Sequence, residues 1–217
     1  MSTLSFTGAW EALLDAIFPR SRAERFVLSL PASSIIRQAP LKERLPSWQH
    51  AALSYRTPLA HTLINLLKYK NSSRAAEKCA EILFHELPSL LSESLPGERF
   101  VLVPIPTSRT RLRERGYSQT ERIAERLIAL QGEAGPLALS PLLVKSRETP
   151  HQTGTRSRRE RLANLKDSFA VRQGIDPQGL RVILIDDVIT TGATLTEARK
   201  TLKRVGAKEI LALAVAH

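Results

Sequence analysis

Two adjacent aspartates have the side-chain type and the setting needed to bind a ligand. Asp186 and Asp187 directly follow the apolar run 182–185 within the segment RVILIDDVITTGAT, residues 181–194. In open α/β sheets, ligands bind outside the carboxyl ends of the strands, where these side chains are expected to emerge. Two carboxylates at that place can accept hydrogen bonds from neighbouring hydroxyl groups. The acid pair is therefore predicted to bind a sugar diol.

A run of small residues follows the acid pair. It consists of Thr190, Thr191, Gly192, Ala193 and Thr194. Backbone N–H groups in such a turn can converge on a phosphate, and a glycine lets the backbone approach closely. Thr194 and Glu197 have the spacing of a capping box, which predicts a helix whose positive end lies beside that phosphate. A phosphate and a diol at this separation describe a ribose 5-phosphate.

A simpler interpretation is a strand end whose acids cap a turn, with the threonines and the glycine only shaping a loop. For the acid pair alone this interpretation would be preferred. The whole pattern over residues 182–194, between a predicted strand and a predicted helix, favours the binding site.

The elements that must position this segment alternate along the chain. Short apolar runs predict strands over residues 100–106, 139–144, 168–171, 182–185 and 210–215. Apolar residues at helical spacing predict helices over residues 9–18, after Pro58, over about 74–87, after Ser118 and between the last two strands. This alternation predicts an α/β fold, with a parallel sheet flanked by helices.

The N-terminal quarter of the chain has a different character. Residues 20–57 contain Pro31, Pro40 and Pro46 and show no long apolar period. We therefore expect an appendage, partly helical and otherwise irregular, over residues 1–57 and the α/β domain over residues 58–217.

The charge of the chain is unbalanced and local. There are 32 lysines and arginines against 21 acidic residues, which gives a formal net charge of +11. Residues 109–122 hold five arginines and two glutamates, and residues 145–166 hold seven basic residues and two glutamates. Such clusters attract polyanions, either a nucleic acid through counterion release or a diphosphate substrate. A solvated basic face without a partner is the alternative.

Composition excludes several classes of protein. At 217 residues and 42% hydrophobic, the chain can bury a substantial core. Cys79 is the only cysteine, so neither an internal disulfide nor a four-cysteine zinc site can form, which favours the cytoplasm. The first thirty residues mix charged with apolar side chains, and no apolar run reaches 18 residues, so we expect no signal peptide and no membrane insertion.

Several segments together resemble a known family. RVILIDDVITTGAT resembles the phosphoribosyl-pyrophosphate (PRPP) motif of the type I phosphoribosyltransferases. VLVPIPTSRTRLRERGYSQ (101–119) and RETPHQTGTRSRRERLANLKDSF (147–169) are similar to the ComF family, phosphoribosyltransferase-like proteins linked to competence and DNA uptake in natural transformation. LINLLKYK (63–70) fits the same family. The resemblance covers about residues 50–217 and implies a type I phosphoribosyltransferase-like fold.

The resemblance also implies roles for individual positions. Asp186 and Asp187 would hold the ribose hydroxyls as the catalytic pair, and residues 190–194 would hold the 5-phosphate. The pyrophosphate-binding loop would consist of Pro106, Thr107, Ser108 and Arg109. A region that closes over the site or binds a polyanion would contain Arg115, Gln119, Arg147, Gln152 and Arg161. Mg²⁺ would arrive with PRPP, held mainly by substrate oxygens.

One departure from the family concerns zinc. Members often carry a four-cysteine zinc module after a helix that ends in Phe-Pro. Here LLDAIFP (13–19) is followed by Arg20, Ser21 and Arg22, without a cysteine. We therefore expect no zinc in this chain.

The resemblance implies a PRPP-binding protein associated with DNA uptake. As an enzyme it would displace pyrophosphate from C1 of PRPP with a nitrogen nucleophile, for example in nucleobase salvage, although no segment is diagnostic of an acceptor. The alternative is a module that binds single-stranded DNA or a competence helicase without turnover. Tyr117 is the only aromatic residue near the basic stretches, so DNA contacts would be mainly to phosphates. A regulator that senses PRPP is a third interpretation.

Overall fold

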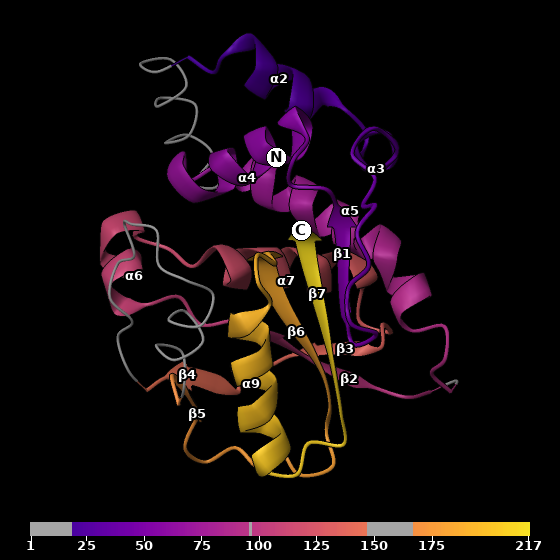
Figure 1. Cartoon of the computed structure of the whole chain (residues 1–217), viewed down its shortest axis with the longest axis vertical. Helices are drawn as coiled ribbons and strands as arrows, with labels where there is room; N and C mark the ends of the chain where they lie inside the picture. Colours follow the sequence, from indigo (N-terminus) through magenta and orange to yellow (C-terminus); the bar gives the residue numbers. More distant parts are fainter. Residues whose placement is uncertain (1–18, 96, 147–166) are drawn as a thin grey trace, which may run out of the picture.

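A parallel β-sheet forms the centre of the computed structural model, which describes residues 19–95, 97–146 and 167–217 (Figure 1). Its spatial order is β1-β7-β6-β2-β3, and all four pairings are parallel. The strands are β1 (Gln49–Leu53), β7 (Glu209–Ala216), β6 (Arg181–Val188), β2 (Phe100–Pro104) and β3 (Leu137–Leu139). The predicted parallel sheet flanked by helices is confirmed.

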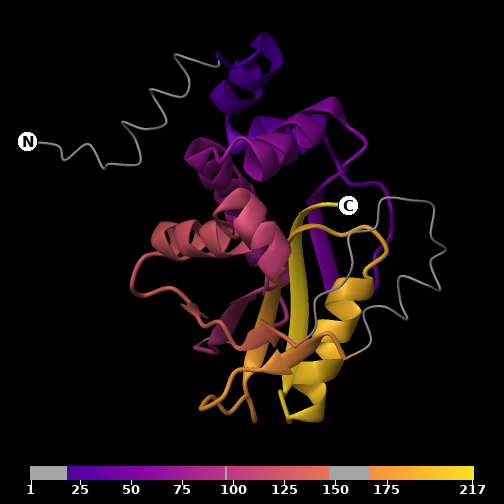
Figure 2. The ribbon, with the colours of Figure 1, turned by 90° about the vertical axis from the view of Figure 1, so that its left-hand side faces the viewer.

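Helices cover both faces of the sheet (Figures 1 and 2). On one face lie α5 (Ser73–Leu90) and α7 (Gln119–Gln131). On the other lie α9 (Ala193–Arg204) and an antiparallel ribbon of β4 (Leu143–Lys145) and β5 (Phe169–Val171). Toward the end to which β6 and β7 point lie α2 (Arg22–Ser29), α3 (Ala32–Gln38), α4 (Pro58–Tyr69) and α6 (Arg109–Arg115). None of the described helices combines the length and apolarity needed to cross a bilayer.

Alternate residues of β6 face opposite helical layers. Ile183 and Ile185 belong to the core formed with α4, α5 and α7, whereas Val182 and Leu184 belong to the core formed with α9. All four side chains are fully buried. Because successive side chains of a strand point to opposite faces, a strand covered on both sides must be apolar at every position. The apolar run therefore continues until β6 leaves its cover of helices.

The stretch over residues 20–57 is more regular than the partly helical, otherwise irregular appendage that the sequence predicts. It contains α2, α3 and β1, and β1 is an edge strand of the main sheet, with Gln49 opposite Ala212. Ile35 and Leu53 are buried in the same core as α4 and α5. The sequence of β1, QHAAL, is short and rich in small residues, so its strand signal is weak. The boundary at residue 57 stays a prediction, although a cut there would remove a strand from the sheet.

Two further elements differ from their predictions. The strand predicted over residues 139–144 is two strands, β3 and β4, which belong to different sheets and are separated by Pro141. Proline has no N–H to donate to a ladder, which explains the interruption. The predicted pyrophosphate loop, residues 106–109, becomes helical at Arg109, because the Ser108 side chain caps α6 by accepting a hydrogen bond from the Arg111 N–H. The predicted helix over residues 9–18 lies outside the described residues.

Candidate functional site

The acid pair lies where β6 emerges from its helical cover. Asp186 and Asp187 follow the buried run directly and are partly buried. The neighbouring strand β2 ends at the same edge, since the Ile105 N–H donates a hydrogen bond to the Ile185 carbonyl at 2.9 Å. The segment that begins at Pro106 therefore leaves the sheet beside the acid pair. The structure thus brings together the start of the predicted pyrophosphate loop and the predicted sugar site.

A lysine that was not among the predicted site residues forms an ion pair with one of the two acids. The Lys68 ammonium group, near the end of α4, lies 3.1 Å from Oδ2 of Asp187, and both side chains are largely shielded from solvent. The Asp187 N–H donates a 2.9 Å hydrogen bond to Oδ1 of Asp186. Lys68 is far from the acids in sequence, so only the fold reveals this contact.

The environment of Asp186 favours its neutral form. Burial raises the pKa of Asp186 to about 7, and the negative charge of Asp187 acts in the same direction. The hydrogen bond from the Asp187 N–H and the charges of Lys68 and Arg111 oppose this rise in pKa. Near neutral pH the site is therefore poised between a singly and a doubly charged acid pair.

The predicted phosphate loop connects β6 to α9. Gly192 has a φ of 70°, in the left-handed region, and immediately precedes the first residue of α9. A Cβ at this position would lie 3.0 Å from Nε2 and 3.1 Å from Oε1 of Gln49. Both the backbone conformation and the close approach of a buried side chain therefore require glycine here. Gln49 belongs to β1 and is not among the site residues predicted from the sequence.

The predicted capping box of α9 is wrong. The helix begins at Ala193, after the Gly192 turn, so Thr194 lies inside its first turn. Glu197 instead accepts a 2.8 Å hydrogen bond from the Asp167 N–H. The Thr191 hydroxyl accepts a hydrogen bond from the Ala193 N–H at 3.4 Å. A side chain of the loop itself therefore stabilises the turn.

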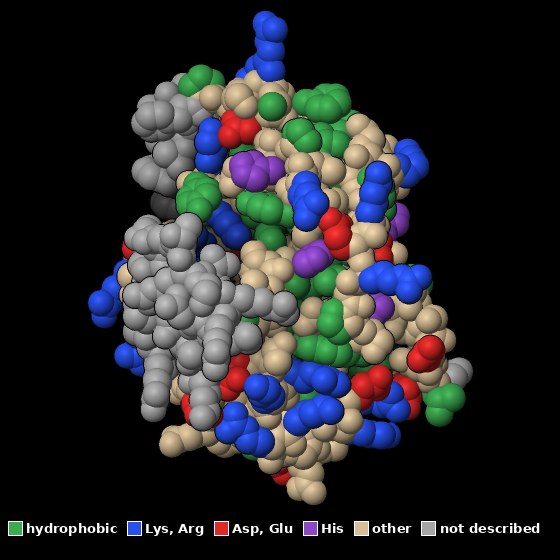
Figure 3. All heavy atoms as spheres, in the orientation of Figure 1, with side chains coloured by type: hydrophobic (Ala, Val, Ile, Leu, Met, Phe, Trp, Pro, Cys, Tyr) green, Lys and Arg blue, Asp and Glu red, His purple; other side chains and the backbone are tan. Residues whose placement is uncertain are grey.

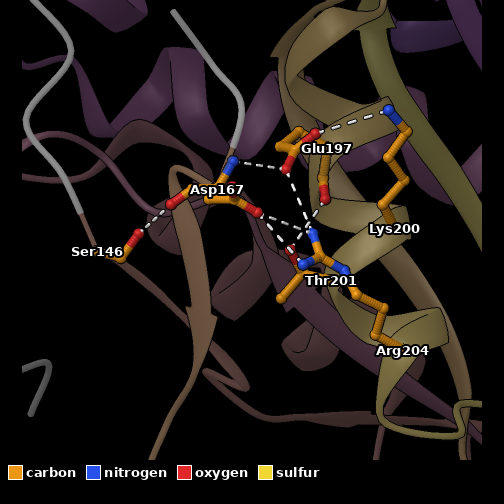
Figure 4. A network of polar contacts seen from close by, with 6 residues as sticks. All are labelled: Ser146, Asp167, Glu197, Lys200, Thr201 and Arg204. Atoms are coloured by element: carbon orange, nitrogen blue, oxygen red, sulfur yellow. Dashed lines mark hydrogen bonds and ion pairs between the residues drawn. The ribbon is translucent and has the colours of Figure 1, made fainter.

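The interaction of Glu197 is part of a network that anchors α9 (Figure 4). Arg204 lies 3.2 and 3.3 Å from Oδ1 of Asp167 and 3.6 Å from Oε1 of Glu197. The Ser146 hydroxyl donates a hydrogen bond to the Asp167 carbonyl, and Thr201 donates one to the Glu197 carbonyl. This network ties α9, whose first turn adjoins the predicted phosphate loop, to the residues beside β4 and β5.

Hydroxyl groups fix the predicted pyrophosphate loop. The Thr107 hydroxyl donates to Oγ of Ser118 at 3.2 Å, and the Thr120 hydroxyl donates to the Ile105 carbonyl at 2.8 Å. Ser108 is buried, and its hydroxyl caps α6. Arg109 is exposed as the first residue of α6. The loop is therefore held from α6 and α7 at once.

The remaining predicted residues are not all brought to this site. Arg115 lies over the ring of Tyr69, with its guanidinium carbon 5.4 Å from the ring centre. Gln119 is only 3% exposed, so it does not contribute to the surface, and its Nε2 has no hydrogen-bond partner among the described residues. Arg147, Gln152 and Arg161 lie outside the described residues. Within the described ranges, no group of three or more His, Cys, Asp or Glu side chains is arranged to hold a metal ion.

Comparison with known proteins gives matches to one family, to curated relatives and to solved structures. The phosphoribosyl transferase domain family matches residues 69–217. DNA utilization protein YhgH of Salmonella typhi is 33% identical over 184 residues, which cover 84% of this chain and 75% of that protein. Competence protein F of Haemophilus influenzae is 30% identical over 169 residues, 76% of this chain and 71% of that protein. A solved hypoxanthine phosphoribosyltransferase from Staphylococcus aureus aligns with a TM-score of 0.37 and 15% identity, over 64% of this chain and 62% of that chain.

The substitution Asp186→Asn is expected to stabilise the fold increasingly as the pH rises. Between the ordinary aspartate pKa and the folded value of about 7, the folded chain holds a proton that the unfolded chain has released. The contribution of this group to stability is therefore present at low pH and is lost as the pH rises toward 7 and beyond. Urea unfolding should show that the free energy of unfolding of the variant, relative to that of wild type, increases by roughly 1–3 kcal/mol between pH 5 and pH 8.

The same change at Asp176 is a suitable control, because Asp176 lies in an exposed turn and accepts a hydrogen bond from the Gln178 N–H. Asp176→Asn should leave the pH dependence of the unfolding free energy unchanged. A stability difference between wild type and Asp186→Asn that is equal at both pH values would contradict the assignment.

Proposed function

The chain belongs to the phosphoribosyl transferase domain family and, within it, to the ComF family, and we propose on this basis that it binds PRPP at the carboxyl end of its sheet. One observation carries the proposal. A shielded acid pair lies near the end of β6, and a glycine turn follows it within six residues. Both lie beside the end of β2. A ribose diol and its 5-phosphate need acceptors and donors at such a separation.

Each part of the proposed site has a distinct task. Asp186 and Asp187 accept hydrogen bonds from the ribose hydroxyls, and the Lys68 ammonium group keeps Asp187 in place. Backbone N–H groups of residues 190–194 bind the 5-phosphate, aided by the positive end of α9. Residues 106–109 bind the pyrophosphate group, with Arg111 nearby to balance its charge.

Mg²⁺ is proposed to arrive with PRPP. The ion would draw most of its ligands from phosphate oxygens and water and would neutralise the charge of the diphosphate. The acid pair is suited to bind the ribose beside the ion and not the ion itself, because Asp187 is already paired with Lys68 and Asp186 accepts a hydrogen bond from the backbone. The chain's own residues then position the ribose, while the substrate holds the ion.

The biological role is proposed to be DNA uptake or utilization, in line with the names of the relatives. Transfer of the phosphoribosyl group to a nitrogen nucleophile and regulated binding of PRPP without turnover both use the same site. Product formation from PRPP with a panel of nucleobases distinguishes transfer from binding alone. A helicase partner stays a prediction.

We predict saturable binding of PRPP by the wild-type chain in the presence of Mg²⁺. The double substitution Asp186→Asn/Asp187→Asn should weaken this binding at least tenfold, because neutral amides lose the charge-assisted hydrogen bonds to the ribose hydroxyls. Isothermal titration calorimetry measures both affinities, and circular dichroism establishes that each protein is folded. Folded wild type that takes up no PRPP would refute the proposed function.

The phosphate half of the site is tested by two glycines at opposite ends of α9. Gly192→Ala should weaken PRPP binding at least tenfold, because alanine is strained at a φ of 70° and its Cβ would press on the Gln49 side chain, 3.0 Å away, so that the loop must shift. Gly206 also has a left-handed φ, of 85°, but it lies after the far end of α9. Gly206→Ala therefore imposes a similar backbone strain, and its PRPP affinity, measured by the same calorimetry, should stay within twofold of wild type. Equal losses in both variants would speak against a phosphate loop at residues 190–194.

The helix α6 favours a second candidate function, the binding of single-stranded DNA. It carries Arg109, Arg111, Arg113 and Arg115 against one glutamate, and none of its residues is buried. Tyr69, which lies under Arg115, is 72% exposed, and bases stack on rings and guanidinium groups of this kind. Tyr117, the aromatic residue considered from the sequence, is instead buried.

The basic residues of α9 are less suited to bind DNA. Figure 3 shows lysines and arginines gathered over α9, with acidic side chains among them. Lys200 and Arg204 in this region lie within ion-pair distance of Glu197, and Arg204 also contacts Asp167. This pairing reduces the positive charge that α9 presents, so α6 is the stronger candidate for a DNA contact.

The substitution Arg113→Ala/Arg115→Ala is predicted to weaken DNA binding and to reduce its salt dependence. Two lost phosphate contacts should lower the slope of log K against log salt by about 1.4. Fluorescence anisotropy with an oligothymidylate at several salt concentrations measures both quantities. Asp186→Asn/Asp187→Asn, and Arg37→Ala on α3, should bind DNA like wild type. Affinity that does not depend on salt would rule out this function for α6.

A further inference from the structure

The end of α4 is attached to the acid pair by an ion pair between distant parts of the chain. Lys68 lies one residue before the segment that matches the phosphoribosyl transferase domain, residues 69–217. Its ammonium group nevertheless contacts Oδ2 of Asp187 at 3.1 Å. The next lysine, Lys70, is the C-cap residue that follows the helix, and it pairs with Glu24 of α2 at 2.9 Å. The two lysines thus have separate partners.

A clamp centred on Tyr117 holds this helix end. The Tyr117 hydroxyl donates a 2.8 Å hydrogen bond to the Leu67 carbonyl and accepts one from the Asn71 N–H at 3.1 Å. Arg122 of α7 donates a hydrogen bond to Oδ1 of Asn71, and its guanidinium carbon lies 4.2 Å from the centre of the Tyr117 ring. Asn71 itself has a left-handed φ of 49°. The clamp therefore fixes the backbone on both sides of Lys68.

The charged and titratable groups around the acid pair come from four elements. Asp186 is its neighbour on β6, Lys68 approaches from α4, and the buried thiol of Cys79 faces it from α5. Burial and the charge of Asp187 raise the pKa of this thiol, which keeps it neutral. Arg111 of α6 acts on Asp186. Among the described residues, the only ion pair of the Asp187 carboxylate is with Lys68.

We propose that Lys68 is a positioning residue of the sugar site, which balances the charge of Asp187 and fixes its carboxylate, and that Tyr117 holds Lys68 in place. This inference rests on the proposed function of the acid pair. It also assigns a task to the segment RGYSQ, residues 115–119: its tyrosine aligns a helix that precedes the matched domain with the carboxyl end of β6. Without the ammonium group, less positive charge would offset the repulsion between the two neighbouring carboxylates. The pair would therefore retain a proton to higher pH.

The unliganded protein provides the first test. Carbon-13 NMR of the aspartate carboxyl groups follows the titration of Asp186 in wild type and in Lys68→Met. The variant should titrate at higher pH than wild type, because the charge of Lys68 lowers the pKa of Asp186. Lys68→Arg should restore the wild-type midpoint, and Lys70→Met is the matched control that should not shift it. Tyr117→Phe should shift it in the same direction as Lys68→Met, by a smaller amount. An unchanged midpoint in Lys68→Met would overturn the proposal.

The second test is the pH dependence of PRPP affinity. Lys68→Met should weaken binding about tenfold at pH 7 and about threefold at pH 9, because alkaline pH removes the retained proton. A uniform loss at both pH values would show only a direct attraction between Lys68 and the ligand and would overturn the positioning role. If wild type binds no PRPP, the proposed function fails, whereas the NMR titration still decides whether Lys68 controls the acid pair.

Discussion

The burial of both faces of β6 is the constraint on which the rest of the structure depends. A central strand between two helical layers can carry only apolar side chains along its covered length, and residues 182–185 satisfy this on both sides. Polar groups that bind a ligand must then stand where the cover ends. Asp186 and Asp187 occupy the first positions at which charge is tolerated. The burial that surrounds them also explains why Asp186 holds its proton to an unusually high pH.

The site that results is assembled from both ends of the chain. The β6 strand supplies the acids and α9 begins at the predicted phosphate loop, but Gln49 of β1 lies against that loop and Lys68 of α4 pairs with Asp187. Gln49 and Lys68 both precede the segment that matches the phosphoribosyl transferase domain. The helix α4 and the strand β1 are therefore part of the architecture of the candidate site.

The features that could be predicted from sequence are those encoded within one continuous segment. The parallel sheet, the β2, β6 and β7 strands and the glycine turn all follow from local apolar patterns and small residues. The contacts of Lys68, Gln49 and Glu197 could not be predicted, because each joins residues that are distant in the chain and no periodicity relates them. The β1 strand escaped prediction because its small residues carry little strand preference. The capping box failed because the Gly192 turn starts the helix before Thr194.

The pairing of β1 with β7 has a practical consequence for anyone who wishes to produce part of this protein. A fragment confined to residues 69–217 would leave one side of β7 without its neighbour, since Gln49 to Leu53 would be missing. The uncovered strand would present a row of unpaired N–H and C=O groups along an apolar segment, ILALAVA, which is a template for association with other chains. Such a fragment is expected to aggregate, so the edge strand serves solubility as well as the site.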